Sequence, residues 1–175
     1  DIENTITGMK YKNDLEELKL TDVLFNMEQS IATADSLLLQ NGYVVFNSAK
    51  INENIIVKNE VVDTTNSSWL IKAQQVNFNK LAAIYYDNNT APIEGFDASH
   101  IDANNINADI TSFLYSKDST RALVKQLSIN DKSGLRLDTT HANILFTNQF
   151  IVATDLYVKT ANSLIQKEIK LSYDS

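Results

Sequence analysis

The sequence contains no cysteine, and it has only 4 Gly and 1 Pro among its 175 residues. Without cysteine the chain has no disulfide framework, no thiolate nucleophile and no zinc site built on sulfur. Long apolar runs are also missing, since Leu37–Leu39 and Leu81–Ile84 are among the longest, whereas a membrane-spanning helix needs roughly 20 apolar residues. No charged and then apolar signal segment opens the chain. We therefore expect a soluble piece or a mature segment that does not itself span a membrane.

Positive charge is scarce as well. The 15 Lys and Arg residues are outnumbered by 22 Asp and Glu, which gives a formal net charge of -7. A protein that follows nucleic-acid phosphates needs a basic block, and none offsets this acidic background, so we expect no nucleic-acid partner. With 43% hydrophobic residues, the chain can bury a sizeable apolar surface, and residues 1–175 are interpreted as a single segment of a larger protein.

Asparagine takes over the turn-forming role that glycine and proline usually have. About twenty Asn, together with Asp and Ser, interrupt segments of alternating polarity. Clear examples are 63–66, 87–90, 116–119 and 130–134. Interruptions at intervals of roughly ten to twenty residues are typical of an antiparallel meander, so the sequence predicts a mainly β fold.

The apolar residues within these segments follow a specific spacing of i, i+2, i+5 and i+7. This is the period of a strand that slips by one residue in its middle and then resumes on the same face. Five copies are clear and two, those beginning at residues 49 and 135, are weaker. The copies are Leu18, Leu20, Val23, Phe25; Ala49, Ile51, Asn54, Ile56; Ile71, Ala73, Val76, Phe78; Ile101, Ala103, Ile106, Ala108; Ala122, Val124, Leu127, Ile129; Leu135, Leu137, Thr140, Ala142; and Ile151, Ala153, Leu156, Val158.

One extra residue in a strand is a β-bulge or a sharp bend, and bends at matching places fold a sheet along a line. The spacing therefore predicts a strongly curved antiparallel sheet with its apolar face inside the curve. Bulged strands also occur in ordinary β-sandwiches, which is the alternative interpretation. Met27, Ile31, Ala34 and Leu38 have helical spacings of four, three and four, and 13–18 is rich in Glu and Leu, so the prediction includes room for one short helix.

Residue patterns for catalysis or metal binding are missing. His100 and His141 lie in strand-like segments without a second ligand at metal-binding spacing, and a hydrogen-bonded or solvent-facing imidazole is the better interpretation. The carboxylates of 16–17, Asp102, Asp109 and Asp155 fall among polar residues and are expected on the outer face. No Gly-rich phosphate loop or nucleophile elbow is present. We expect no enzyme activity, no cofactor and no metal.

The C-terminal half carries a set of motifs in a characteristic order. The two most specific are Lys132-Ser133-Gly134-Leu135-Arg136-Leu137 and Lys159-Thr160-Ala161-Asn162-Ser163. Others are Glu94-Gly95-Phe96-Asp97, His100-Ile101, Asn105-Ile106-Asn107-Ala108, Phe113-Leu114-Tyr115-Ser116-Lys117-Asp118, Leu127-Ser128-Ile129 and Leu171-Ser172-Tyr173. Together residues 94–175 resemble the translocation and assembly module TamB proteins of Bacteroidetes, within the AsmA-like superfamily. Residues 1–93 share only the strand spacing.

This resemblance implies a fold and a function. The family's fold resembles a long sheet bent into a U-shaped trough, the β-taco, whose concave face shelters acyl chains. By similarity, we expect a non-enzymatic, bridge-like segment for phospholipid transfer between the inner and outer membranes, or for outer-membrane protein assembly. The expected partners are phospholipid or fatty-acyl chains and an outer-membrane barrel protein. The expected location is the periplasm, with the parent protein anchored in the inner membrane.

The residues expected to line the lipid groove all come from the C-terminal half. They are Ile101, Ala103, Ile106, Ala108, Val124, Leu127, Ile129, Leu135, Leu137, Ile144, Phe146, Ile151, Ala153, Leu156 and Val158. The alternative function is that of a surface-exposed structural or adhesive β-protein, in which the same residues fill a closed dry core. Whether the apolar face is an open groove or a filled interior distinguishes the two.

Four tripeptides resemble the O-glycosylation sequence of envelope proteins in the same bacterial group. They are Asp35-Ser36-Leu37, Asp63-Thr64-Thr65, Asp118-Ser119-Thr120 and Asp138-Thr139-Thr140. Such short patterns also arise from ordinary turn chemistry, which is the alternative for each of them.

Overall fold

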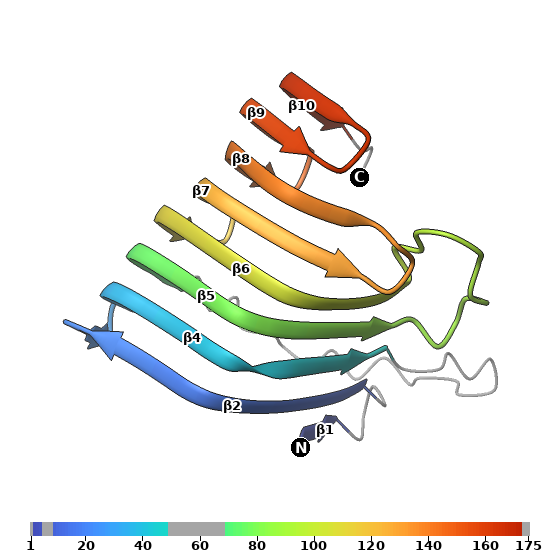
Figure 1. Cartoon of the computed structure of the whole chain (residues 1–175). Coiled ribbons are helices and arrows are strands. Elements are labelled where there is room, and N and C mark those ends of the chain that lie inside the picture. The colour runs from blue at the N-terminus through green and yellow to red at the C-terminus, as the bar shows by residue number, and fades with distance from the viewer. Residues whose placement is uncertain (1, 5–8, 49–68, 173–175) are drawn as a thin grey trace.

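A computed structural model describes residues 2–4, 9–48 and 69–172, and these residues form one β-sheet without a helix (Figure 1). The mainly β prediction is therefore confirmed. The strands are β1 (Ile2–Asn4), β2 (Met9–Thr21), β3 (Leu24–Asn26), β4 (Ile31–Asn47), β5 (Leu70–Tyr86), β6 (His100–Tyr115), β7 (Ser119–Asp131), β8 (Arg136–Thr147), β9 (Phe150–Lys159) and β10 (Leu164–Ser172). The weak repeat at Ala49, Ile51, Asn54 and Ile56 and the tripeptide Asp63-Thr64-Thr65 lie outside the described residues.

The strands follow chain order across the sheet, from β1 and β2 at one edge to β10 at the other. The short strand β3 pairs with the beginning of β4, while β2 pairs with the rest of β4. The sheet is open, because β2 and β10 do not pair with each other. From β6 to β10 each strand pairs with the next through a short turn, as the prediction of a meander implies, whereas longer connections join β4 to β5 and β5 to β6.

One pair departs from the antiparallel prediction. β4 and β5 run parallel, with Ile31 aligned to Leu70 and Asn47 to Tyr86. The reason is the length of the connection over residues 48–69, because a parallel pair needs a crossover of a dozen or more residues. The sheet is therefore mixed, with one parallel pair among antiparallel ones.

The predicted short helix is wrong for the described residues. Residues 13–18 lie in β2, and Met27 lies in the turn between β3 and β4, where Ser30 N–H donates to the Met27 carbonyl at 3.3 Å. Residues 31–38 belong to β4. Pairing on both sides of β4 satisfies its backbone groups, and this tertiary context overrides the helix-like spacing of its apolar residues.

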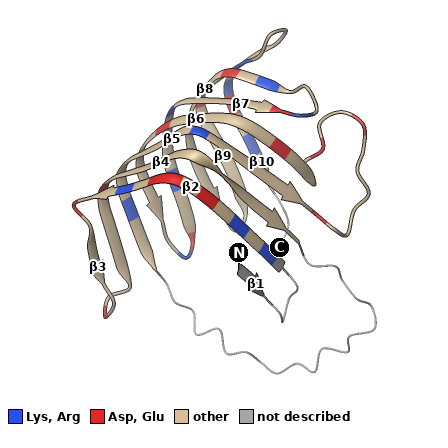
Figure 2. Cartoon of the chain, turned by 60° about the horizontal axis from the view of Figure 1, so that its bottom comes forward, with Lys and Arg blue, Asp and Glu red and all other residues tan. Residues whose placement is uncertain are grey.

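The strands bend in mid-length, which turns the sheet into an arched trough (Figure 2). Several non-glycine residues at the bends and irregular positions have a positive φ, among them Asn41 (46°), Lys80 (51°), Asn105 (48°) and Asp155 (49°). Asn and Asp tolerate this conformation best, which suits Asn41, Asn105 and Asp155 to these positions. Asn105 and Asp155 occupy the slip positions that the i, i+2, i+5, i+7 spacing predicts.

The buried apolar residues lie on one face of this single layer. They are Ala73, Val76, Leu81, Ala103, Ala108, Val124, Ala142 and Leu156. No side chain among the described residues is fully buried. Since the described part of the chain has no second layer, burial comes from the curvature of the sheet itself. The buried face is therefore the concave face, and the trough predicted from the slipped spacing is present.

Candidate apolar groove

An apolar row crosses the concave face along its floor. Residues aligned between neighbouring strands point to the same face, so the register defines the row. The floor row consists of Leu18, Leu39, Phe78, Ala108, Leu127, Thr140, Val158 and Ile165. It runs from β2 to β10 without a charged residue. Thr140 is its one polar member, and the Thr140 hydroxyl is buried and has no hydrogen-bond partner among the described residues.

A second row lies beside the floor row. It consists of Leu20, Leu37, Val76, Ile110, Val124 and Ala142, aligned strand by strand from β2 to β8. Leu156 continues it in β9, next to the bend at Asp155. Two adjacent rows of this kind give the trough an apolar floor from β2 to β9.

A third row forms one rim of the trough and is rich in aromatic residues. This aromatic rim consists of Phe25, Ala32, Ile71, Tyr115, Thr120, Phe146, Ile151 and Leu171. Many of its side chains are exposed, with Phe25 at 62% and Leu171 at 58% of their maximal accessible area. Phe25 stacks on Trp69 with ring centroids 5.0 Å apart. The aromatic rim therefore presents apolar surface to solvent over the whole width of the sheet.

The trough contains a hollow of about 380 Å³ between β3 and β6. Its lining combines the second row with the aromatic rim and includes Leu20, Phe25, Leu37, Ile71, Val76, Phe78, Ile110 and Phe113. A volume of this size is within the range of small-molecule sites. Because apolar side chains dominate the lining, the hollow suits a hydrocarbon chain better than a polar ligand.

The bend in β4 brings the backbone of two strands very close. A Cβ atom at Gly42 would overlap the Asp14 carbonyl oxygen and lie 2.8 Å from the Leu15 Cα. Gly42 aligns with Leu15 of β2 and Leu81 of β5 in the wall of the trough. A residue without a side chain is needed here for the close approach of the backbones.

The register places the sequence-predicted groove residues on the concave face, with one exception. Leu135 lies in the turn before β8. Ala108, Leu127 and Val158 belong to the floor row, Val124 and Leu156 to the second row, and Phe146 and Ile151 to the aromatic rim. The remaining aligned pairs are Ile101 with Tyr85, Ala103 with Ala83, Ile106 with Leu81, Ile129 with Leu137, and Ile144 with Ala153. Their role in binding lipid stays a prediction.

Sequence reasoning missed the hollow, because the predicted residues begin at Ile101. The hollow is built mainly from β2 to β5 and the second half of β6. Three of its β4 residues, Ala32, Ala34 and Leu37, belong to a copy of the slipped spacing, which Leu39 completes. The copies that begin at Leu18 and Ile71 were recognised from the sequence and supply most of the other lining residues, so what was missed is their role in a groove.

Charged residues concentrate on the two edge strands and the loops, and β2 has the densest run (Figure 2). Lys167 of β10 aligns with Leu156 of β9 and so extends the second row to the edge. Charges on edge strands hinder pairing with other chains. The apolar floor is thus bounded by charged strands at both of its ends.

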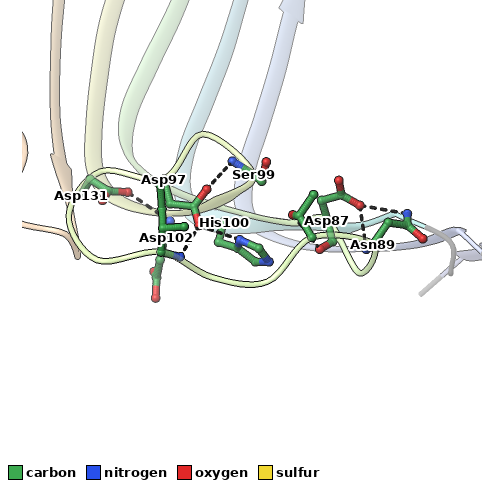
Figure 3. A network of polar contacts seen from close by, with 9 residues as sticks. Asp87, Asn89, Asp97, Ser99, His100, Asp102 and Asp131 are labelled. Atoms are coloured by element: carbon green, nitrogen blue, oxygen red, sulfur yellow. Dashed lines mark hydrogen bonds and ion pairs between the residues drawn. The ribbon is translucent and has the colours of Figure 1, made fainter.

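A polar network orders the loop between β5 and β6 at the rim opposite the aromatic one (Figure 3). Asp97 accepts hydrogen bonds from Ile93 N–H at 3.1 Å and Ser99 N–H at 2.9 Å, and its carboxylate lies 2.8 Å from His100 Nδ1. The backbone hydrogen bond from Ile93 is the main cause that lowers the pKa of Asp97, and the contact with His100 lowers it further. The ionised carboxylate of Asp97 therefore stabilises the conformation of this loop.

Two more aspartates support this rim in the same way. The hydrogen bond from the Ser48 hydroxyl, at 2.7 Å, is the main cause that lowers the pKa of Asp87. Burial alone would raise the pKa of Asp131, but hydrogen bonds from Ser133 and from Asp102 N–H outweigh it and lower the pKa. These carboxylates organise turns and do not face one another as a catalytic pair would.

The remaining candidate residues have structural surroundings. His141 stacks on Tyr157 with ring centroids 5.0 Å apart. Asp155 accepts a hydrogen bond from Asn143 at 2.6 Å, and Asp102 lies 3.7 Å from Lys132 Nζ. In the described ranges, His, Asp and Glu do not gather in groups of three or more that suit a metal ion.

The tripeptides that resemble glycosylation sequences lie in different settings. Asp35-Ser36-Leu37 is within β4 and Asp138-Thr139-Thr140 is within β8, whereas Asp118 lies in the β6–β7 turn and Ser119 and Thr120 begin β7. Leu37 and Thr140 point into the trough. None of the described segments forms a helix of the length and hydropathy needed to cross a bilayer.

Comparison with known proteins gives no further guidance, because no protein-family model, curated protein or solved structure matches this chain.

Proposed function

We propose that this chain is a non-enzymatic segment of a bridge-like envelope protein, and that its trough holds the acyl chains of phospholipids during transfer between the inner and outer membranes. The observation that supports this most directly is the uncharged floor row, which runs from Leu18 to Ile165 on the open concave face. Assistance to outer-membrane protein assembly is the related role that the sequence resemblance also implies. The proposed location is the periplasm.

The energetics of the trough favour an apolar occupant. Burial of apolar surface is worth about 25 cal/mol per Å², so an open apolar groove gains free energy when it is covered. The exposed side chains of the aromatic rim and the hollow near Leu37 add to the area that an occupant would cover. Such a surface is suited to bind a hydrocarbon chain.

The same surface also suits transfer. A lipid that moves along a groove has to bind weakly at many successive positions, and uniform apolar rows provide equivalent positions. Specific hydrogen bonds would hold the lipid at one place. In the floor row, Thr140 is the one member that offers a polar atom.

The alternative of a structural or adhesive protein with a dry core requires a second layer over the concave face. The described strands form one sheet, so such a layer would have to come from elsewhere. No structural observation favours this alternative, and it is kept as one outcome of the experiment.

Native mass spectrometry of protein purified without added lipid tests the proposal. We expect adducts with the masses of acyl lipids, and transfer of a fluorescent phospholipid between donor and acceptor vesicles that increases with protein concentration. A protein that carries no lipid and binds neither fatty acids nor phospholipids would contradict the proposal and favour the dry-core alternative.

A further inference from the structure

A single positive charge interrupts the apolar rows at the β10 edge. Lys167 aligns with Leu156, and it lies between Ile165 and Ile169, which align with Val158 and Ala153. All nine residues of β10 are exposed. The ammonium group of Lys167 is therefore accessible at the open end of an otherwise uncharged floor.

Within the described ranges, this ammonium group has no acidic partner. No ion pair among the described residues includes Lys167. The carboxylate of Asp155, just before Leu156 in β9, accepts a hydrogen bond from Asn143. The other lysine in the middle of β10 behaves differently, because Lys170 aligns with Val152 and its Nζ lies 5.3 Å above the Phe150 ring. Lys167 and Lys170 thus belong to opposite faces of the same strand.

We propose that Lys167 binds the phosphate of a phospholipid whose acyl chain lies on the floor of the trough. This inference rests on the proposed function. Charge complementarity supports this: an anionic amphiphile places its chain on an apolar surface and its charge at the end of that surface, where the ammonium group of Lys167 lies. A lysine ammonium is well suited to a phosphate as a point charge.

A second role for such a residue would be purely protective. Inward-pointing charges on edge strands prevent edge-to-edge association. In that case, replacement of Lys167 would change the oligomeric state and leave the binding of different lipids in the same proportion. The two roles therefore predict different measurements.

The test compares two ligands of equal chain length on three proteins. Lysophosphatidate and the matching monoacylglycerol differ only in the phosphate, and their affinities are measured by calorimetry at low ionic strength. The proteins are the wild type, Lys167→Met and the control Lys170→Met, which removes the same charge from the outer face of the same strand. Size-exclusion chromatography monitors the oligomeric state of each.

We expect the wild type and Lys170→Met to prefer lysophosphatidate about fivefold, the effect of one exposed ion pair. Lys167→Met should lose this preference and bind monoacylglycerol as before. The preference should also decrease as salt is added.

Three results would overturn the inference. The first is a wild type that binds both ligands equally, which leaves the proposed function intact. The second is an equal loss of preference in both variants, which indicates a general effect of net charge. The third is a Lys167→Met variant that self-associates and keeps its preference, as the protective role predicts. If the wild type binds neither ligand, the proposed function fails as well.

Discussion

The side-chain oxygen of Asn107 in β6 accepts a hydrogen bond from the backbone N–H of Lys80 in β5, at 3.0 Å. The amide nitrogen of Asn107 donates to the Asn105 carbonyl at 2.8 Å. Both Lys80 and Asn105 have a positive φ, and the register between β5 and β6 shifts between Phe78 and Leu81. The amide of Asn107 therefore satisfies backbone groups that the regular ladder no longer pairs at the bend.

Replacement of Asn107 with Ala should destabilise the bend. It leaves two backbone groups without their partner, and each unsatisfied group costs about 1 to 3 kcal/mol where water does not replace the bond. We expect the free energy of unfolding to fall by about 1 to 2 kcal/mol, measured by chemical denaturation. Asn104→Ala is the control, because the Asn104 side chain is exposed and bonds only to the Asn105 side chain in the described contacts. Equal effects of the two substitutions would contradict this account.

Replacement of Gly42 with Ala should destabilise the trough wall. The new Cβ would overlap the Asp14 carbonyl and lie 2.8 Å from the Leu15 Cα, so β2 and β4 would have to separate. Overpacking of this kind costs about 1 to 3 kcal/mol. Gly134→Asn serves as the control in the same denaturation experiment. Gly134 has open space around it and a φ of 94°, and Asn tolerates positive φ better than most residues. A Gly42→Ala protein as stable as the wild type would show that the strands can separate without cost.

The curvature of the sheet could be predicted from the sequence because its cause is local. A slip such as that between Ala103 and Ile106 requires an extra residue in the strand, and Asn105 occupies it with a positive φ. The same holds for Asp155, between Ala153 and Leu156. Residue type and spacing both carry this information, so the bends and the concave face follow from the chain alone.

The arrangement of β4 could not be predicted in the same way. Its residues Ile31, Ala34 and Leu38 have helical spacing. They form a strand because this segment pairs with β2 and β5. The parallel alignment of β4 and β5 depends on where residues 48–69 return the chain, which no local pattern encodes. The hollow between β3 and β6 was missed for a different reason: the slipped spacing of its strands is visible in the sequence, but the resemblance that assigned the groove covers only residues 94–175.

Acid should weaken the loop between β5 and β6. Hydrogen bonding lowers the pKa of Asp97 in the folded protein relative to the unfolded chain, where Asp titrates near 3.9. A lowered pKa contributes stability that is present above the unfolded value and is lost as the pH falls through the folded value. We therefore expect the unfolding free energy to decrease below about pH 4. Asp97→Asn should be less stable at neutral pH and show a shallower decrease in acid. The two proteins would have parallel pH profiles if Asp97 did not contribute.

Replacement of Leu37 with Asp should separate the two interpretations of the concave face. Leu37 lies in the second row, aligned with Leu20 and Val76, and it lines the hollow. A carboxylate without a partner costs several kcal/mol in a closed core, but much less where water reaches it in an open trough. We expect Leu37→Asp to remain folded with a modestly lowered Tm and to bind a fluorescent fatty acid at least tenfold more weakly, since removal of apolar contact and a like charge both oppose the ligand.

The neighbouring residue provides a matched control for this substitution. Leu38 belongs to the outer face and aligns with Lys19, so Leu38→Asp introduces the same charge next to a lysine. This control should bind the fatty acid as the wild type does, as measured by fluorescence titration, while circular dichroism reports the fold of both variants. If Leu37→Asp unfolds outright and the wild type ignores the fatty acid, the concave face is a closed core, because only there does one uncompensated carboxylate cost enough to unfold the sheet. A folded Leu37→Asp protein with undiminished affinity would instead place the acyl chain away from the hollow.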